Sequence, residues 1–333
     1  MTGGERGSIP VFFSGIPGPD VFTFLVKRIL ATIPVLLIVA VLVFLMLRLT
    51  PGDPAAIIAG DAASPENIAQ IRESLGLSKP LAVQFGIWFG NLITGQLGES
   101  YFYKMQVTQL ISQRIEPTLA LSLCTIVIAV LVAVPLGVIA AWKQGGWLDR
   151  ALMGFSVMGF SIPVFVLGYI LIWIVSLKLG WLPVQGYERL AGGFGPFIRH
   201  LILPSITLSV IYIALIARVT RAAVQDVLSE DYIRTARAKG LPESRVLIRH
   251  ALANAAVPII TVIGIGIALL IGGVVVTESV YGIPGLGRLT VDAVLARDFP
   301  TIQGVILFFS FVYVLINLLV DLSYLFFDPR IRY

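Results

Sequence analysis

Long uncharged apolar stretches alternate with short polar ones along most of this chain. The hydrocarbon core of a bilayer is ~30 Å thick, so a helix rising ~1.5 Å per residue needs about 20 apolar residues to cross it. Lipid offers no hydrogen-bond partner to an open backbone, so a run that crosses must be helical. Six runs reach or approach this length and predict an all-α membrane protein with six transmembrane helices: Ile29–Leu47, Pro117–Ala141, Ala151–Val175, Leu201–Ala217, Ala251–Thr277 and Phe299–Val320.

Two of these runs allow a second interpretation. Leu201–Ala217 has only 17 residues, but the long side chain of Arg218 can reach the interface and lengthen the span. Ile29–Leu47 resembles the core of a signal peptide, yet it is longer than such a core and lacks a small-residue cleavage site behind it. We therefore interpret it as a retained first helix.

The composition agrees with a membrane environment. The 333 residues are 57% apolar and only 13% charged, whereas soluble domains are about 25% charged. The net charge of +5 is modest. In a membrane protein, an excess of Lys and Arg in the cytoplasmic segments explains such a charge better than nucleic-acid binding does.

The Lys and Arg residues also predict the orientation. With both termini in the cytoplasm, fourteen of the 24 lie on inner segments and ten outside. Half of the outer ten belong to or border one long loop, where the positive-inside rule loses force. The remaining contrast predicts that both termini are cytoplasmic; the family resemblance described below implies that the membrane is the bacterial cytoplasmic (inner) membrane.

Segments between the runs suggest the domain organisation. The outer loop carries two helical patterns, Pro65–Leu75 and Leu81–Leu92, and a polar inner loop occupies 225–250. The predicted units are a Gly/Pro-rich cytoplasmic tail (1–23), a first transmembrane helix (24–48), a large external loop (49–113), a five-helix transmembrane domain (114–327) and a cytoplasmic end (328–333).

The inner loop has the pattern of two short helices. Ser229 can cap the first, Gly240 suits a left-handed stop, and Pro242 can open the second. Tyr232 and Ala236 lie four residues apart and therefore share a face. From these residues alone, a basic helix on anionic lipid and a helix docked in a groove of a cytoplasmic partner are equally good interpretations.

A family resemblance favours the second interpretation. Residues 229–258 resemble the cytoplasmic loop of binding-protein-dependent ABC importer permeases, which docks on an ATPase subunit. The family pattern is Glu-Ala-Ala, three residues, then Gly; here Arg234-Thr235-Ala236 replaces the triplet and Gly240 is the glycine. The sequence Arg-Thr-Ala-Arg-Ala-Lys-Gly is typical of the dipeptide and oligopeptide branch. Three further stretches are similar to that branch, so the resemblance covers residues 24–333: Leu47 to Pro54, Glu278 to Gly287, and Asp328 to Arg330.

This resemblance implies a type I ABC importer permease core that moves di- or oligopeptides. The implied partners are a second, homologous permease in a heterodimer, two ATP-binding subunits that carry ATP and Mg, an extracytoplasmic solute-binding protein, the peptide and membrane lipid, with no nucleic acid. Relatives that carry nickel complexes, glutathione or a sugar leave the cargo open. The residues implied in coupling to the ATPase are Tyr232, Ile233, Ala236, Arg237 and Gly240.

Several absences limit the alternatives. The chain has no Gly-x-x-x-x-Gly-Lys-Ser/Thr phosphate loop, so separate subunits must hydrolyse ATP. One cysteine, Cys124, and two distant histidines, His200 and His250, predict neither a metal site nor a catalytic triad, and we expect no cofactor and no enzyme activity. An ion-coupled secondary transporter is the rival from another class, but the six runs contain no ionisable residue of the kind that such coupling uses.

A few polar or helix-bending residues near the runs are candidate functional sites. Gly272, Gly273 and Glu278 are candidates for an external gate, although a structural role for Glu278 at the rim is the simpler interpretation. Asn317 and Asp321 are four residues apart on one helix face and are predicted to form an internal polar pair. Three prolines are expected to bend their helices: Pro135, Pro163 and Pro258.

Overall fold

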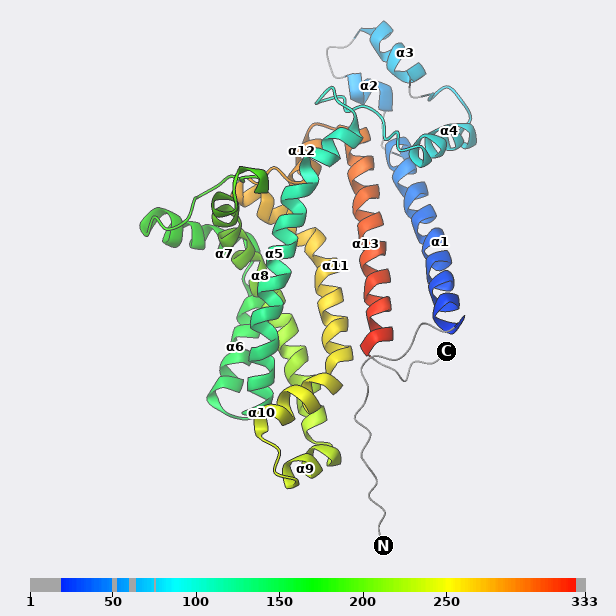
Figure 1. The fold of residues 1–333 in the computed structure, drawn as a ribbon. Coiled ribbons are helices and arrows are strands. Elements are labelled where there is room, and N and C mark those ends of the chain that lie inside the picture. The colour runs from blue at the N-terminus through cyan, green and yellow to red at the C-terminus, as the bar shows by residue number, and fades with distance from the viewer. Residues whose placement is uncertain (1–18, 50–52, 60–63, 75, 328–333) are drawn as a thin grey trace.

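The structure is a computed structural model that describes residues 19–49, 53–59, 64–74 and 76–327. Nearly every described element is a helix, and the long helices run side by side as a bundle (Figure 1). Residues 1–18 of the predicted tail (1–23) and the predicted cytoplasmic end (328–333) lie outside the described residues.

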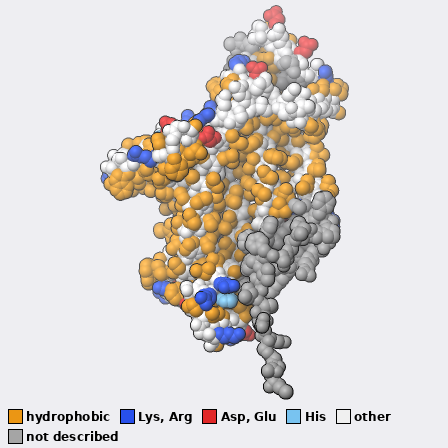
Figure 2. Space-filling model, viewed as in Figure 1, with side chains coloured by type: hydrophobic (Ala, Val, Ile, Leu, Met, Phe, Trp, Pro, Cys, Tyr) orange, Lys and Arg blue, Asp and Glu red, His pale blue; other side chains and the backbone are white. Residues whose placement is uncertain are grey.

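Among the described residues, five helices are long and apolar enough to cross a membrane, and a bent pair makes a possible sixth span. Figure 2 shows hydrophobic side chains over the middle of the bundle and charged ones near its two ends. The long helices are α1 (Pro19–Leu49), α5 (Val107–Trp142), α8 (Phe194–Leu228), α11 (Ala256–Tyr281) and α13 (Phe299–Phe327).

The bent pair corrects the expectation of one continuous third span. The run Ala151–Val175 divides into α6 (Trp147–Ser161) and α7 (Val164–Leu171), which continues as the π-helix η1 (Ile172–Lys178), with a bend of 102° between the two halves. Pro163 accounts for the break because it lacks a backbone donor and drives the residue before it toward extended backbone. Ile162 is extended accordingly (φ −88°, ψ 120°).

Other boundaries also differ from the apolar runs. Helix α8 extends well beyond the predicted Leu201–Ala217 at both ends, because side chains such as Arg199 and Arg221 can lie on a helix outside the hydrocarbon. Helix α11 begins at Ala256, after the π-helix η3 (Val246–Leu252), and continues through Glu278. Helix α5 begins seven residues before the predicted end of the external loop.

The external loop is helical where the sequence predicts it. Helices α3 (Pro65–Ser74) and α4 (Leu81–Ile93) match the two expected patterns, and a third short helix, α2 (Pro54–Ala59), precedes them. The remaining short elements are η2 (Leu190–Gly192), α9 (Asp231–Ala238), α10 (Glu243–Arg245) and α12 (Leu286–Leu295).

The core lies where α5, α8 and α11 meet. Leu121, Leu208 and Leu270, one from each of these helices, are buried together. The buried Tyr281 hydroxyl lies 2.6 Å from the Thr207 hydroxyl and donates to the Gly168 carbonyl oxygen at 3.3 Å, which ties α11 to α8 and α7. Helices α1 and α13 lie at the edge of this core (Figure 1).

Candidate functional site

The polar loop between α8 and α11 folds as a compact unit at the end of the bundle opposite α12 (Figure 1). Gly240 has φ of +75°, so the predicted left-handed stop after α9 is confirmed. Ser229 does not cap α9. Its hydroxyl donates to the Asp226 carbonyl oxygen at 2.7 Å, and Glu230 precedes α9 in extended conformation. Pro242 stands just before α10 rather than at its first position.

This loop has a small core of its own. Ile233 and Ala236 on α9 are buried against Val246 of η3, with Leu228 of α8 packed beside them. Both side chains therefore stabilise the loop from inside, and their predicted role in coupling to an ATPase subunit stays a prediction. An apolar residue every three positions on a short helix is the sequence signal for such an inward face.

The outward face of the loop is polar and basic. Tyr232 is 44% exposed, and Lys239 and Gly240 are also exposed. Arg237 is largely engaged within the loop, where its Nη2 and Nε donate to Glu243 at 2.6 and 3.2 Å across the turn. Of the five predicted coupling residues, Tyr232 and Gly240 are therefore the ones most directly available to a partner.

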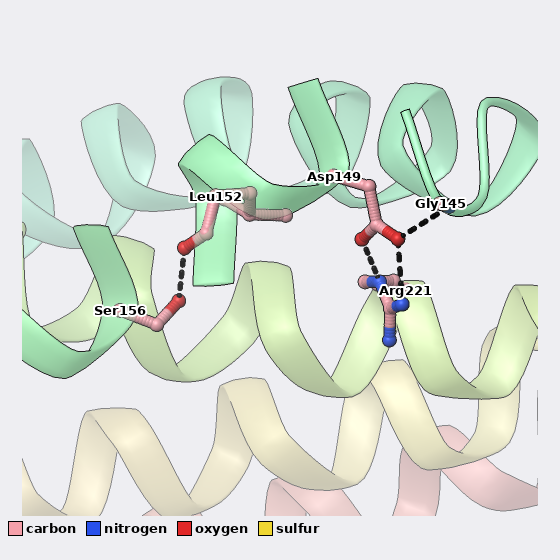
Figure 3. Close-up of polar contacts among 5 residues, drawn as sticks. All are labelled: Gly145, Asp149, Leu152, Ser156 and Arg221. Atoms are coloured by element: carbon pink, nitrogen blue, oxygen red, sulfur yellow. Dashed lines mark hydrogen bonds and ion pairs between the residues drawn. The ribbon is translucent and has the colours of Figure 1, made fainter. Parts of the chain in front are cut away.

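A largely buried ion pair fixes the adjoining ends of α6 and α8. The Arg221 Nη2 donates to Asp149 Oδ2 at 2.8 Å, and its Nε donates to Asp149 Oδ1 (Figure 3). The Gly145 backbone also donates to Asp149, at 2.9 Å, so the α5–α6 turn joins the same site. About two turns farther along α6, Ser156 Oγ donates to the Leu152 carbonyl oxygen at 2.9 Å (Figure 3).

Sequence reasoning missed this ion pair. Asp149 lies in the first turn of α6, which begins directly after Gly145 and Gly146, and a carboxylate is common at such a position. Arg221 lies 72 residues away, and no sequence pattern links it to Asp149. The pair matters for position because Arg221 is about two turns before the end of α8, and α9 follows directly. The ion pair therefore joins α6 to α8 close to the turn that leads into α9.

At the opposite end of the bundle, Glu278 is wholly buried in the described chain. Its Oε1 accepts from the Thr118 hydroxyl at 2.6 Å and its Oε2 accepts from the Arg288 backbone at 2.9 Å. Thr118 in turn accepts from the Leu286 backbone at 2.8 Å. Glu278 and Thr118 thus satisfy the open donors of the first turn of α12 and hold it against α5 and α11. These contacts agree with the simpler interpretation of Glu278 as a structural residue, and its role as an external gate stays a prediction.

The two glycine gate candidates differ from each other. A Cβ on Gly273 would come within 2.9 Å of Leu208 and 3.2 Å of the Tyr212 hydroxyl, so Gly273 allows α8 and α11 to approach closely. A Cβ on Gly272 would meet nothing within 4 Å in the described chain. Helix α11 is continuous through both positions.

The predicted Asn317–Asp321 pair is wrong. Asp321 Oδ2 lies 3.2 Å from Arg28 Nε of α1, whereas the Asn317 amide donates to the Tyr313 carbonyl oxygen at 3.0 Å on its own helix. A charged partner on the neighbouring helix is a stronger attraction for a carboxylate than an amide one turn away. Asp321 therefore joins α1 to α13.

A second buried carboxylate, Asp298, was also missed. It accepts from the hydroxyls of Ser100 and Thr301 and from the Tyr101 backbone, directly before α13. An aspartate immediately before an apolar run is a helix-start signal that the sequence offered. Burial near this carboxylate raises the pKa of the Tyr101 phenol.

The described residues contain no group of three His, Cys, Asp or Glu side chains that could hold a metal ion. The expectation that this chain binds no cofactor stays a prediction.

Two family models match most of this chain. Residues 133–333 match the family of binding-protein-dependent transport system inner membrane components, and residues 21–122 match the N-terminal region described for such membrane components. The chain belongs to this family. It is thus an ABC transporter permease subunit in the inner membrane and not a catalytic enzyme.

Two relatives cover almost the whole chain. A "probable peptide ABC transporter permease protein" of Sinorhizobium fredii is 54% identical over 93% of this chain and 99% of its own length. A glutathione transport system permease protein of Pectobacterium atrosepticum is 46% identical over the same shares. Permeases of this family work with ATP-binding subunits and a binding protein.

A solved structure shares the fold. The inward-facing MetNI methionine ABC transporter matches with a TM-score of 0.54 at 18% identity, over 65% of this chain and 94% of that one. The predicted type I importer permease fold is therefore confirmed.

Proposed function

We propose that this permease moves di- or oligopeptides across the cytoplasmic membrane. The observation that carries the proposal is the 54% identity, over nearly the full length of both chains, to a relative named for peptide transport. Glutathione is the second candidate cargo because a permease named for it is 46% identical over a similar length. Both cargoes are short peptides, so they differ in size and linkage rather than in chemical class.

The α9–η3 loop is the element that we propose docks on an ATP-binding subunit. Its outward face combines the exposed ring of Tyr232 with the basic Lys239, and its inner core keeps α9 rigid. Helix α9 begins two residues after α8 ends, and Arg221 ties α8 to α6. A push on the loop would therefore move packed helices rather than a loose segment. ATP would then bias the bundle between two states through contacts that differ at this loop.

The proposed assembly follows from the family resemblance. A second, homologous permease completes a heterodimer, two ATP-binding subunits bind the α9 ends, and a solute-binding protein docks at the α12 end. The described external elements α2, α3 and α4 offer a large surface there. The α9 end is cytoplasmic in this arrangement, as the Lys and Arg bias requires.

The orientation can be tested with single cysteines. In a Cys124→Ser background, Gln144→Cys marks the α5–α6 turn and Glu188→Cys marks the segment before α8; both positions are exposed. An impermeant thiol reagent on intact cells should label residue 188 and spare residue 144. The reverse pattern would overturn the orientation.

The cargo can be tested in proteoliposomes that contain this permease, its partner permease and both ATP-binding subunits. ATP-dependent uptake of a labelled dipeptide, a labelled pentapeptide and glutathione is compared with and without the solute-binding protein. We expect peptide uptake only with the binding protein present. Uptake of glutathione alone would make glutathione the cargo, and saturable high-affinity uptake without any binding protein would contradict the proposed mode of transport.

A further inference from the structure

Helix α4, at the α12 end of the bundle, is apolar but too short to cross a membrane. Its 13 residues contain no charged side chain. Figure 1 shows α4 lying across the end of α1 instead of continuing along it. The neighbouring α3 is different, since it carries Glu66, Arg72 and several other polar residues.

One side of α4 is fastened to α1. The Phe44 ring of α1 lies 5.2 Å from the Phe85 ring and 5.5 Å from the Trp88 ring. Arg48 Nε donates to the Gln84 Oε1 at 3.0 Å, and the Arg48 guanidinium lies over the Phe44 ring. These contacts place α4 at the depth of the last turns of α1, where the apolar run ends.

The polar residues of α4 lie on one arc of the helix. At ~100° per residue, Gln84, Ile87 and Asn91 are neighbours, and all three line a cavity of about 430 Å³. The same cavity is lined by charged side chains from the segments before and after α4, including Lys79 and Glu99. This arc therefore faces polar surroundings.

The opposite arc of α4 carries no polar side chain. Its members are apolar or glycine, and they are partly or fully exposed: Ala82, Gly86, Phe89 and Ile93. Ile93 alone is 72% exposed. Water contact with such an arc is unfavourable in proportion to its apolar area, at about 25 cal/mol per Å².

Helix α1, which α4 contacts at its end, also has an exposed apolar surface, as expected of a helix that crosses a membrane. The exposed side of α1 below it consists of large aliphatic residues, among them Ile38, Leu42 and Leu49. We infer that α4 lies in the membrane interface at the α12 end and buries its apolar arc among phospholipid acyl chains. Trp88 and Arg48, on the α1 side of the helix, have the chemistry of residues that anchor proteins at this level.

The proposed lipid contact gives the external loop a fixed height above the membrane. Helix α4 links α1 to the segment that leads into α5, so a helix held in the interface limits how far this loop can tilt. A binding protein that docks on the loop would then meet a surface at a constant distance from the bilayer.

The test uses the permease complex in nanodiscs of phosphatidylethanolamine and phosphatidylglycerol. In a Cys124→Ser background, an environment-sensitive fluorophore is attached at Ala82→Cys or Ile93→Cys on the apolar arc. The matched control is Asn91→Cys, an exposed position on the polar arc of the same helix. Quenching by phospholipids with a shallow nitroxide is compared with quenching by aqueous iodide.

The interfacial position predicts that the ratio of lipid to iodide quenching is at least about threefold higher at residues 82 and 93 than at residue 91. Equal ratios at all three positions would show that α4 stands in water and overturn the proposal. Protection of residues 82 and 93 from both quenchers would show that a protein subunit covers this arc, which also overturns it. Retained ATP-dependent uptake confirms that each labelled complex is folded.

Discussion

Asp149 on α6 and Arg221 on α8 form a bidentate ion pair about two turns before the α9–η3 loop. Asp149 is almost completely buried, and Arg221 is mostly shielded. A charge pair in such a place contributes through fixed geometry, because either charge left alone would be costly to bury.

The first prediction concerns this pair. Asp149→Asn leaves Arg221 without its counter-ion and should lower stability by about 3 kcal/mol. Because α6 then separates more readily from α8, the rate of peptide uptake should fall by a larger factor than the rate of ATP hydrolysis. The number of peptides imported per ATP should therefore decrease. The measurement is uptake and ATPase activity on the same proteoliposomes, with a thermal melt of the complex.

The matched control for this pair is Asp231→Asn on α9. Asp231 also pairs with an arginine, Arg234, but its side chain is 94% exposed, and exposed pairs contribute little. We expect near-normal uptake from this variant. If both variants behave alike, burial of the Asp149–Arg221 pair has no role in coupling.

The second prediction distinguishes the role of the buried core of the α9–η3 loop from the role of its outward face. Ala236→Asp places a carboxylate in the small core with Ile233 and Val246, so the loop should unfold locally and become sensitive to protease. Tyr232→Ala changes the outward face and leaves the small core intact, so the loop should stay resistant while less ATP-binding subunit co-purifies. Proteolysis of the permease alone and co-purification from membranes measure the two effects. A protease-sensitive Tyr232→Ala loop would show that this ring stabilises the loop itself.

The third prediction concerns the first turn of α12. Thr118→Val preserves shape but removes the hydroxyl that joins Glu278 to the Leu286 backbone, at a cost of about 1–3 kcal/mol for the buried groups left unpaired. Hydrogen exchange at the amides of 286–288 should therefore become faster. Thr290→Val is the control, since the Thr290 hydroxyl bonds only to a carbonyl of its own helix. Unchanged exchange in the Thr118 variant would show that α12 is held by other contacts.

The fourth prediction tests close packing against hinge motion in α11. A Cβ at Gly264 would lie 2.5 Å from Cγ2 of Val320 on α13, so Gly264→Ala should destabilise the bundle by about 1–3 kcal/mol. Val320→Ala should restore much of the loss in the double variant, because it removes the clashing methyl groups. Thermal stability in detergent measures both changes.

Gly272→Ala supplies the comparison for this prediction. The added methyl group meets nothing within 4 Å in the described chain, and the helix propensity of alanine is higher than that of glycine by about 1 kcal/mol. Stability should therefore be maintained. A loss of uptake in this stable variant would assign Gly272 to a moving joint or a subunit contact.

Apolar runs and local signals determined much of this protein. Lipid leaves a long apolar run only one conformation, so the helical bundle follows from the sequence almost directly. Local rules also apply wherever cause and effect lie within a few residues, as at Gly240, whose left-handed backbone ends the turn after α9, or at Pro163, which interrupts the third span.

The tertiary structure decided which polar groups meet. Asp321 bonds to Arg28, nearly three hundred positions away, instead of to the nearby Asn317, because α1 and α13 pack side by side. Glu278 appeared to sit at a rim, yet α12 folds back over it and supplies backbone donors. Ala236 carries the family motif, but only the packing of η3 against α9 shows that its methyl group faces inward. Such pairings depend on how helices are arranged around a shared core, and no periodicity within one helix contains that information.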